Sequence, residues 1–82
     1  MNIKAAALIQ LAESRSWTIP KLAERLGVDY SYLFRVLNNE KKGGAKLFAG
    51  IYRLCKEENL SFDDYMEFET LEAFNQIKNS TR

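Results

Sequence analysis

The sequence predicts an all-α fold in which five short helices pack around one core. Apolar residues recur at spacings of three and four, and no segment shows the alternation that a strand requires. The single proline and the four glycines separate these apolar segments. With 82 residues, 46% of them apolar and 28% charged, the chain has the composition of a folded protein with room for one core.

The first two helices are predicted at residues 3–14 and 19–26. The first carries a stripe of apolar side chains on one face, and Asn2 can cap its N-terminus. Thr18 is a good N-cap for the second helix, whose first turn accommodates proline. Gly27 supplies the positive φ angle that ends this helix in a tight turn.

The third helix is predicted at residues 30–38. Asp29 can cap it, and Leu33 and Val36 recur on the side that faces the core. Two short helices joined by a glycine-containing turn make the helix-turn-helix unit. The sequence therefore predicts this unit at its second and third helices.

A polar loop at residues 39–44 precedes a fourth helix at residues 45–58, which has a continuous apolar stripe. Ser61 and Asp64 have the spacing of a capping box, so a fifth helix is predicted to begin near Phe62. These elements define a first domain.

Apolar residues at every third position mark the last part of the chain, among them Phe68, Leu71, Phe74 and Ile77. Such a row shifts by about 60° at each step around a helix, so one straight helix cannot bury all of it on one surface. The row is therefore expected to pack in a bent tail, to form a homodimer, or to bind a partner protein. We divide the chain into a domain at residues 1–66 and an acidic, aromatic extension at residues 67–82.

The net charge of +1 hides a separation of charge along the chain. Residues 1–56 contain ten basic and four acidic side chains, a net charge of +6. The remaining residues contain two basic and seven acidic side chains, a net charge of −5. This separation favours a molecule that presents one end to a polyanion, although two ordinary solvated surfaces would give the same count.

Residues 19–38, IPKLAERLGVDYSYLFRVLN, resemble the helix-turn-helix of the lambda-repressor and Cro (Xre-type) DNA-binding family. The resemblance rests on Ala23 where the two helices touch, on Gly27 in the turn, and on the spacing of the apolar residues. It extends over residues 3–66 and implies a compact five-helix domain that binds a double-stranded DNA operator as a homodimer. It also implies a transcriptional regulator, a repressor, whose third helix enters the major groove.

The resemblance implies base contacts from the start and the outer face of this third helix, at Tyr30, Ser31, Phe34 and Arg35. The guanidinium of Arg35 can hold guanine O6 and N7 together, unless it pairs with Glu24 or Glu40. Phe34 can touch a thymine methyl group, unless the following loop covers it at the edge of the core.

Polar and basic residues that border this face are predicted to contact phosphates: Lys21, Asn38, Asn39, Lys41, Lys42 and Lys46. The alternative for the loop lysines is that they are merely solvated. Asp29 would repel phosphates, so we assign it to helix capping.

The composition argues against an enzyme, a metal site and a membrane protein. The chain has no histidine and one cysteine, which excludes His-assisted catalysis, structural zinc and a disulfide framework. Cys55 is expected to be an inert thiol in the core. The longest apolar run has five residues, whereas a membrane helix needs roughly 20. We therefore expect a cytoplasmic protein without cofactors.

A second function remains open from the sequence. The chain could be a protein-interaction module, such as an antitoxin-like or phage regulatory protein, whose C-terminal segment binds a partner protein. The apolar row in residues 67–82 is the feature that favours this alternative.

Overall fold

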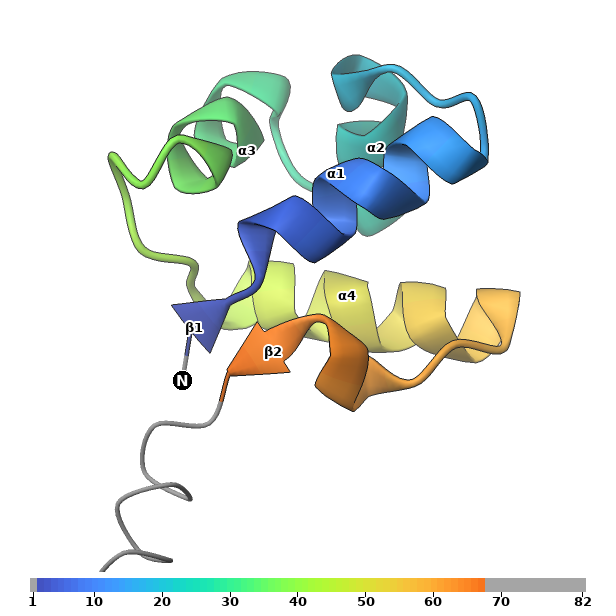
Figure 1. The fold of residues 1–82 in the computed structure, drawn as a ribbon. Coiled ribbons are helices and arrows are strands. Elements are labelled where there is room, and N and C mark those ends of the chain that lie inside the picture. Colours follow the sequence, from blue (N-terminus) through green and yellow to red (C-terminus); the bar gives the residue numbers. More distant parts are fainter. Residues whose placement is uncertain (1, 68–82) are drawn as a thin grey trace, which may run out of the picture.

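The computed structural model describes residues 2–67, which form four α-helices and a small antiparallel sheet (Figure 1). The helices are α1 (Ala5–Ser14), α2 (Ile19–Leu26), α3 (Tyr30–Leu37) and α4 (Ala45–Glu58). Two strands, β1 (Asn2–Ile3) and β2 (Met66–Glu67), pair with each other, and a 3₁₀ turn, η1 (Phe62–Asp64), precedes β2. The described part of the chain is therefore mostly helical, as the apolar spacing predicts.

The helices pack around a core to which each of them contributes leucine. α2 contacts α1, α3 and α4, and α1 also contacts α3, while α4 runs beneath α1 (Figure 1). One leucine from each helix is completely shielded from solvent: Leu8, Leu22, Leu33 and Leu47. Within residues 2–67, no helix is both long enough and apolar enough to cross a bilayer.

The two predicted N-caps of the α2–α3 pair are confirmed. The Thr18 side chain accepts a hydrogen bond from the Lys21 N–H at 3.3 Å. The Asp29 carboxylate accepts from the N–H groups of Ser31 and Tyr32, at 3.0 and 3.4 Å. These bonds satisfy donors that the first turn of a helix leaves free. Asp29 therefore serves the start of α3, as predicted.

Each of the four α-helices is followed by a residue in the left-handed conformation: Ser16, Gly27, Asn39 and Asn59. At Gly27, φ is +75°, and the Val28 N–H reaches back to the Ala23 carbonyl oxygen at 3.0 Å. This is the Schellman arrangement, which ends a helix and turns the chain sharply. The prediction for Gly27 is confirmed, and the turn brings α3 against α2.

The first predicted helix begins two residues too early. Asn2 does not cap it, because residues 2–3 form β1 and pair with Met66 and Glu67. The Lys4 N–H then donates to the Tyr65 carbonyl oxygen at 2.9 Å, so the chain is extended until Ala5. A partner far along the chain thus overrides the local preference for helix.

The prediction of a fifth helix is wrong within the described residues. η1 is a single 3₁₀ turn, and the Ser61 side chain makes no capping hydrogen bond. Tyr65 and Met66 are then buried in the core, and β2 begins. Pairing with β1 and burial of these two side chains replace the helix that the capping-box spacing suggests.

Gly50 is buried within α4. It therefore does not separate two segments, although the distribution of glycines along the sequence suggests that it would. A Cβ atom added at Gly50 would collide with the carbonyl oxygen of Leu26, and it would lie 3.1 Å from the carbonyl carbon of the same residue. Glycine is therefore required because α4 crosses the end of α2 in direct backbone contact.

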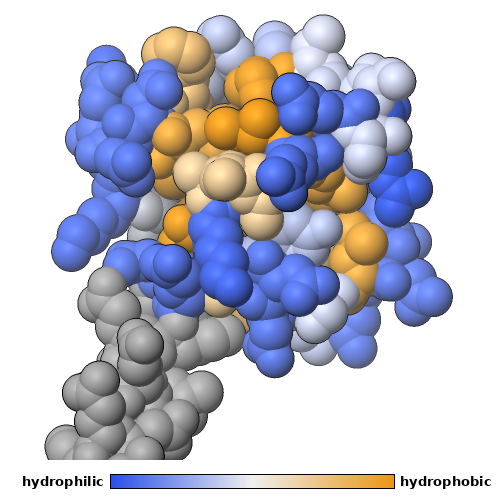
Figure 2. Space-filling model, viewed as in Figure 1, coloured by the Kyte–Doolittle hydropathy of each residue, from blue (hydrophilic) through white to orange (hydrophobic). Residues whose placement is uncertain are grey.

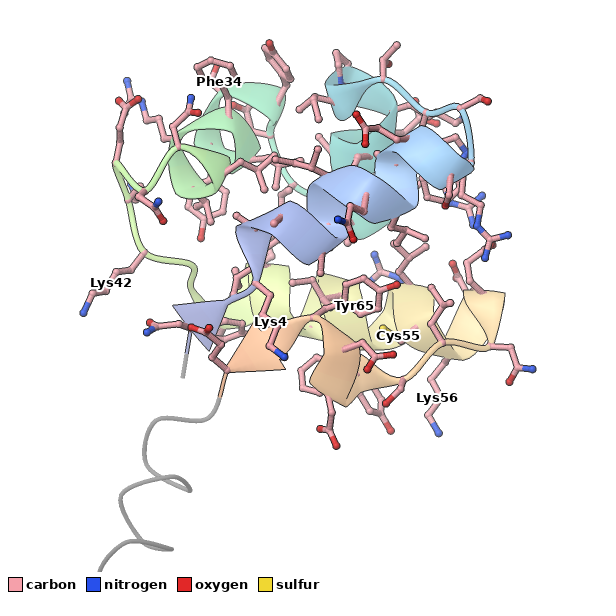
Figure 3. The ribbon with its side chains drawn as sticks, viewed as in Figure 1. Lys4, Phe34, Lys42, Cys55, Lys56 and Tyr65 are labelled. Carbon is pink, nitrogen blue, oxygen red and sulfur yellow. The ribbon has the colours of Figure 1, made fainter. Side chains whose placement is uncertain are left out.

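Cys55 lies on α4 and Tyr65 follows η1, and both side chains are buried in the core (Figure 3). Burial raises the pKa of the Cys55 thiol above its ordinary value of 9.0, and the nearby Asp64 carboxylate raises it further. Burial likewise raises the pKa of the Tyr65 hydroxyl above 10.0. Both groups are thus held in their neutral forms.

These raised pKa values predict a loss of stability at alkaline pH. The unfolded chain releases the Cys55 proton near pH 9.0, while the folded chain still holds it. The contribution of Cys55 to the free energy of unfolding should therefore be fully present below that pH and be lost as the pH rises through the raised value. Urea unfolding of the Cys55→Ala variant across this range should show a shallower decline. An equal decline in both proteins would contradict the assignment.

Candidate nucleic-acid interface

α3 has one face in the core and one face in solvent. Leu33 and Val36 are buried, and Tyr32 and Leu37 are half-buried. All four residues predicted to contact bases are exposed together on the remaining surface: Tyr30, Ser31, Phe34 and Arg35. Residues spaced three and four apart adjoin on a helix, so these side chains form one continuous strip.

Two aromatic rings stand exposed at the start of this strip. Tyr30 is 44% exposed and Phe34 is 47% exposed, with ring centroids 6.0 Å apart. Phe34 points away from the body of the protein (Figure 3). The following loop does not shield its ring, so the alternative of a covered aromatic at the core edge is not what the structure shows.

Arg35 is exposed and forms no ion pair with any residue of 2–67. Glu24 instead pairs with Lys21, at 3.2 Å. Glu40 meets Arg35 through the backbone, where its N–H donates to the Arg35 carbonyl oxygen at 2.8 Å. The guanidinium fork of Arg35 is therefore available to a ligand.

The six residues predicted to contact phosphates are all exposed. Lys21 lies on α2 and Lys46 in the first turn of α4, and the others lie in residues 38–44, which we call the lysine loop. Hydrophilic side chains gather over the end of α3 and this loop (Figure 2), and Lys42 extends away from the body (Figure 3). Lys21 has a partner in Glu24, but exposed pairs of this kind are weak.

Tyr32 belongs to this region, although no sequence pattern predicts it as a site residue. The Tyr32 hydroxyl accepts a hydrogen bond from the Gly44 N–H at 2.7 Å, and the Lys41 ammonium lies 5.5 Å from the centroid of the Tyr32 ring. Tyr32 thus connects α3 to the lysine loop. Twelve positions separate Tyr32 from Gly44, so no local pattern could have indicated the bond.

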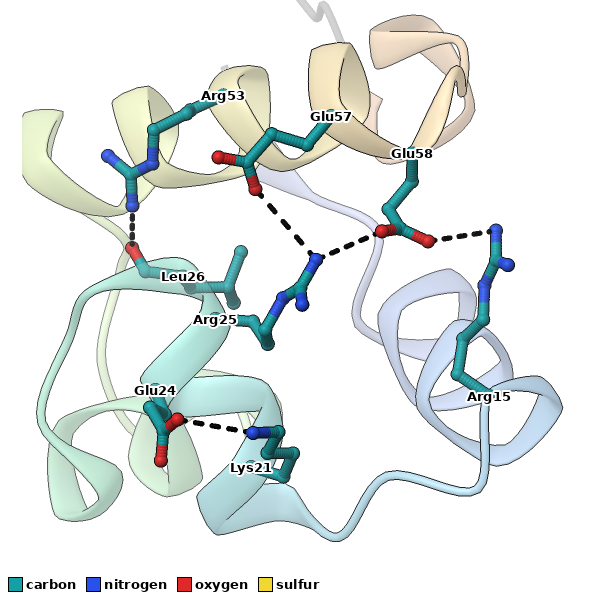
Figure 4. Close-up of polar contacts among 8 residues, drawn as sticks. All are labelled: Arg15, Lys21, Glu24, Arg25, Leu26, Arg53, Glu57 and Glu58. Carbon is teal, nitrogen blue, oxygen red and sulfur yellow. Dashed lines mark hydrogen bonds and ion pairs between the residues drawn. The ribbon is translucent and has the colours of Figure 1, made fainter.

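The opposite charges of the chain meet in space in an ion-pair network (Figure 4). The Arg25 guanidinium lies 2.9 Å from the Glu58 carboxylate and 3.9 Å from that of Glu57, and Arg15 lies 3.4 Å from Glu58. The network joins α2 and α4 to Arg15, the residue that directly follows α1. Two bases of the predicted basic region are thereby neutralised, so the count along the chain overstates the separation of charge.

Four cations without an ion pair inside residues 2–67 lie on α3, on the lysine loop and in the first turn of α4: Arg35, Lys41, Lys42 and Lys46. Arg35 shares the exposed face of α3 with the rings of Tyr30 and Phe34, and Lys41 lies over the ring of Tyr32. In the part of the chain that the structure describes, no three Cys, Asp or Glu side chains gather as metal ligands would.

The residues predicted to mediate dimerisation lie outside the described residues: Phe68, Leu71, Phe74 and Ile77. Residues 2–67 therefore leave that prediction as it stands. The same holds for the partner protein expected at the C-terminal segment.

Comparison of the chain with protein-family models, with curated proteins and with solved structures found no match. The arrangement of α3 and the lysine loop is therefore what supports a function for this chain.

Proposed function

We propose that this chain is a sequence-specific regulator of transcription, a repressor, that reads the major groove of double-stranded DNA with α3. One observation carries the proposal. The exposed strip of α3 faces solvent and includes Arg35, and three more cations with no ion pair among the described residues follow it in the chain: Lys41, Lys42 and Lys46. A helix of this width fits the major groove, and flanking cations suit the phosphates on either side.

The residues of the strip suit different parts of a base edge. The exposed guanidinium of Arg35 can donate to O6 and N7 of one guanine. Phe34 can contact the methyl group of thymine, since its ring is apolar and nearly half exposed. Tyr30 and Ser31, at the start of α3, can offer hydroxyl groups to neighbouring base edges.

The lysine loop supplies affinity rather than sequence preference. Lys41 and Lys42 are exposed next to α3, and phosphate contacts carry no direct information on sequence. Each lysine that neutralises a phosphate releases a condensed counterion, so binding weakens as the salt concentration rises.

Alanine at both Lys41 and Lys42 should weaken binding to every duplex. The slope of log K against log salt should become shallower by about 2, because each lost contact contributes about 0.9. Fluorescence anisotropy with a labelled duplex at several salt concentrations measures this slope, and it also tests whether the unaltered protein binds double-stranded DNA.

A matched double variant distinguishes the loss of phosphate contacts from a general loss of positive charge. Lys4 and Lys56 are exposed lysines that lie away from Phe34 and the lysine loop (Figure 3). Alanine at both positions removes the same charge and should leave the slope unchanged. Equal slopes for the two double variants would contradict a specific role for the lysine loop.

We further propose that the protein binds as a homodimer, with residues 67–82 as the candidate dimerisation segment. Two copies of α3 would then enter successive major grooves, about 34 Å apart, on a two-fold symmetric operator. Should this segment bind a partner protein instead, the chain would act as a monomer on one half-site.

A further inference from the structure

Tyr32 connects the exposed helix to the loop that carries two of its neighbouring cations. Its half-buried ring packs against the core, while its hydroxyl accepts the Gly44 N–H at 2.7 Å. The ammonium of Lys41 lies over the same ring, 5.5 Å from its centroid. One side chain of α3 therefore contacts both the middle and the end of the lysine loop.

Gly43 packs closely against Ile3 and Leu47, whereas the exposed Lys41 and Lys42 that precede it depend on other contacts for their position. Lys41 and Lys42 border an open groove of about 410 Å³, with Asn2 and Ile3 on its other side. The start of the loop is held by the left-handed turn at Asn39. At the other end, the Tyr32 hydroxyl holds the backbone just before α4 begins.

We infer that Tyr32 is a positioning residue for phosphate binding, which holds Lys41 and Lys42 beside α3 in the free protein. The inference rests on the proposed function and adds a residue that itself reads no base. A loop that is already ordered loses less conformational freedom when it binds, so fixing it strengthens binding. The effect should be the same for every duplex, because phosphates carry no direct sequence information.

The Tyr32→Phe variant tests this role, because it keeps the ring beneath Lys41 and removes only the hydroxyl. Affinity for selected and for random duplexes should fall by the same factor, about three- to tenfold, as expected for one lost hydrogen bond. The preference among bases should not change. A loss confined to the selected duplex would overturn the inference.

The matched control is Tyr52→Phe, since Tyr52 is an exposed tyrosine on α4 whose hydroxyl makes no hydrogen bond within residues 2–67. Its affinity should equal that of the unaltered protein. In a background with alanine at both Lys41 and Lys42, Tyr32→Phe should have no further effect, because it acts through those lysines. A full additional loss in that background would show that Tyr32 acts by another route and would overturn the inference.

Hydrogen exchange tests the same contact without DNA. The Gly44 amide of the full chain should exchange faster in Tyr32→Phe than in the unaltered protein, while the amides of the core helices stay unchanged. Unchanged exchange at Gly44 would overturn the inference even if DNA binding is found. An unaltered protein that binds no duplex, combined with faster exchange at Gly44, would instead refute the proposed function alone.

Discussion

Replacing Gly50 with alanine is expected to lower the free energy of unfolding by about 3 kcal/mol, at the upper end of what overpacking a core costs. The added Cβ atom would meet the carbonyl oxygen of Leu26, which belongs to the backbone and cannot rotate away. Relief requires α4 to move away from α2. Alanine favours a helix over glycine by up to about 1 kcal/mol, which is too little to compensate.

The control for this variant is Gly44→Ala. A Cβ atom at Gly44 would lie 3.7 Å from the Tyr32 hydroxyl oxygen, an ordinary contact, so the loss should stay below about 1 kcal/mol, the usual effect of alanine at an N-cap. Chemical denaturation followed by circular dichroism compares the two. Similar midpoints for both variants would show that α2 and α4 do not touch as described.

The second large effect is expected at Arg35. Its replacement by alanine should reduce the preference for guanine at one position of the half-site by roughly 10- to 100-fold, since a bidentate contact discriminates by about 1 to 3 kcal/mol. Competition binding with duplexes that differ at that position measures the change. Stability should not fall, because the side chain is exposed and forms no ion pair within residues 2–67.

Arg35→Lys is the informative companion variant. Lysine keeps the positive charge but lacks the planar fork, so general affinity should be retained while the guanine preference is lost. If both variants keep the preference of the unaltered protein, Arg35 does not read a base.

Features that depend on neighbouring residues could be predicted from the sequence. Thr18 and Asp29 cap the helices that follow them, and Gly27 ends α2, because each acts through hydrogen bonds within five residues along the chain. The exposed strip of α3 can also be predicted from neighbouring residues. Once Leu33 and Val36 are assigned to the core, the helical period decides which side chains remain outside.

Features that depend on distant residues could not be predicted. The pairing of β1 with β2 joins the two ends of the described chain and replaces helix at both, although the local capping pattern at Ser61 favours a helix. Gly50 lies within the helix predicted at residues 45–58, but the need for glycine there emerges only when α4 is placed against the Leu26 carbonyl group. In each case, the decisive contact is made by residues that no sequence window contains together.

The candidate site shows the same division. The exposed residues of α3 follow from helical spacing, whereas the bond from Gly44 to Tyr32 depends on how the lysine loop folds back. A net charge along the chain does not reveal that Arg25 pairs with Glu58 across α2 and α4. Among the described residues, the unpaired positive charge therefore includes a strip on α3, the lysine loop and the first turn of α4, and it does not extend over all of residues 1–56.

Selection of bound duplexes from a random pool of double-stranded DNA by the full chain tests the central claim most directly. If α3 reads the major groove, successive rounds should enrich one sequence that contains a guanine whose identity matters only while Arg35 is present. For a dimer, the enriched sequence should contain two symmetric half-sites about one helical turn apart. A pool that stays random, with no duplex retained even at low salt, would contradict the account.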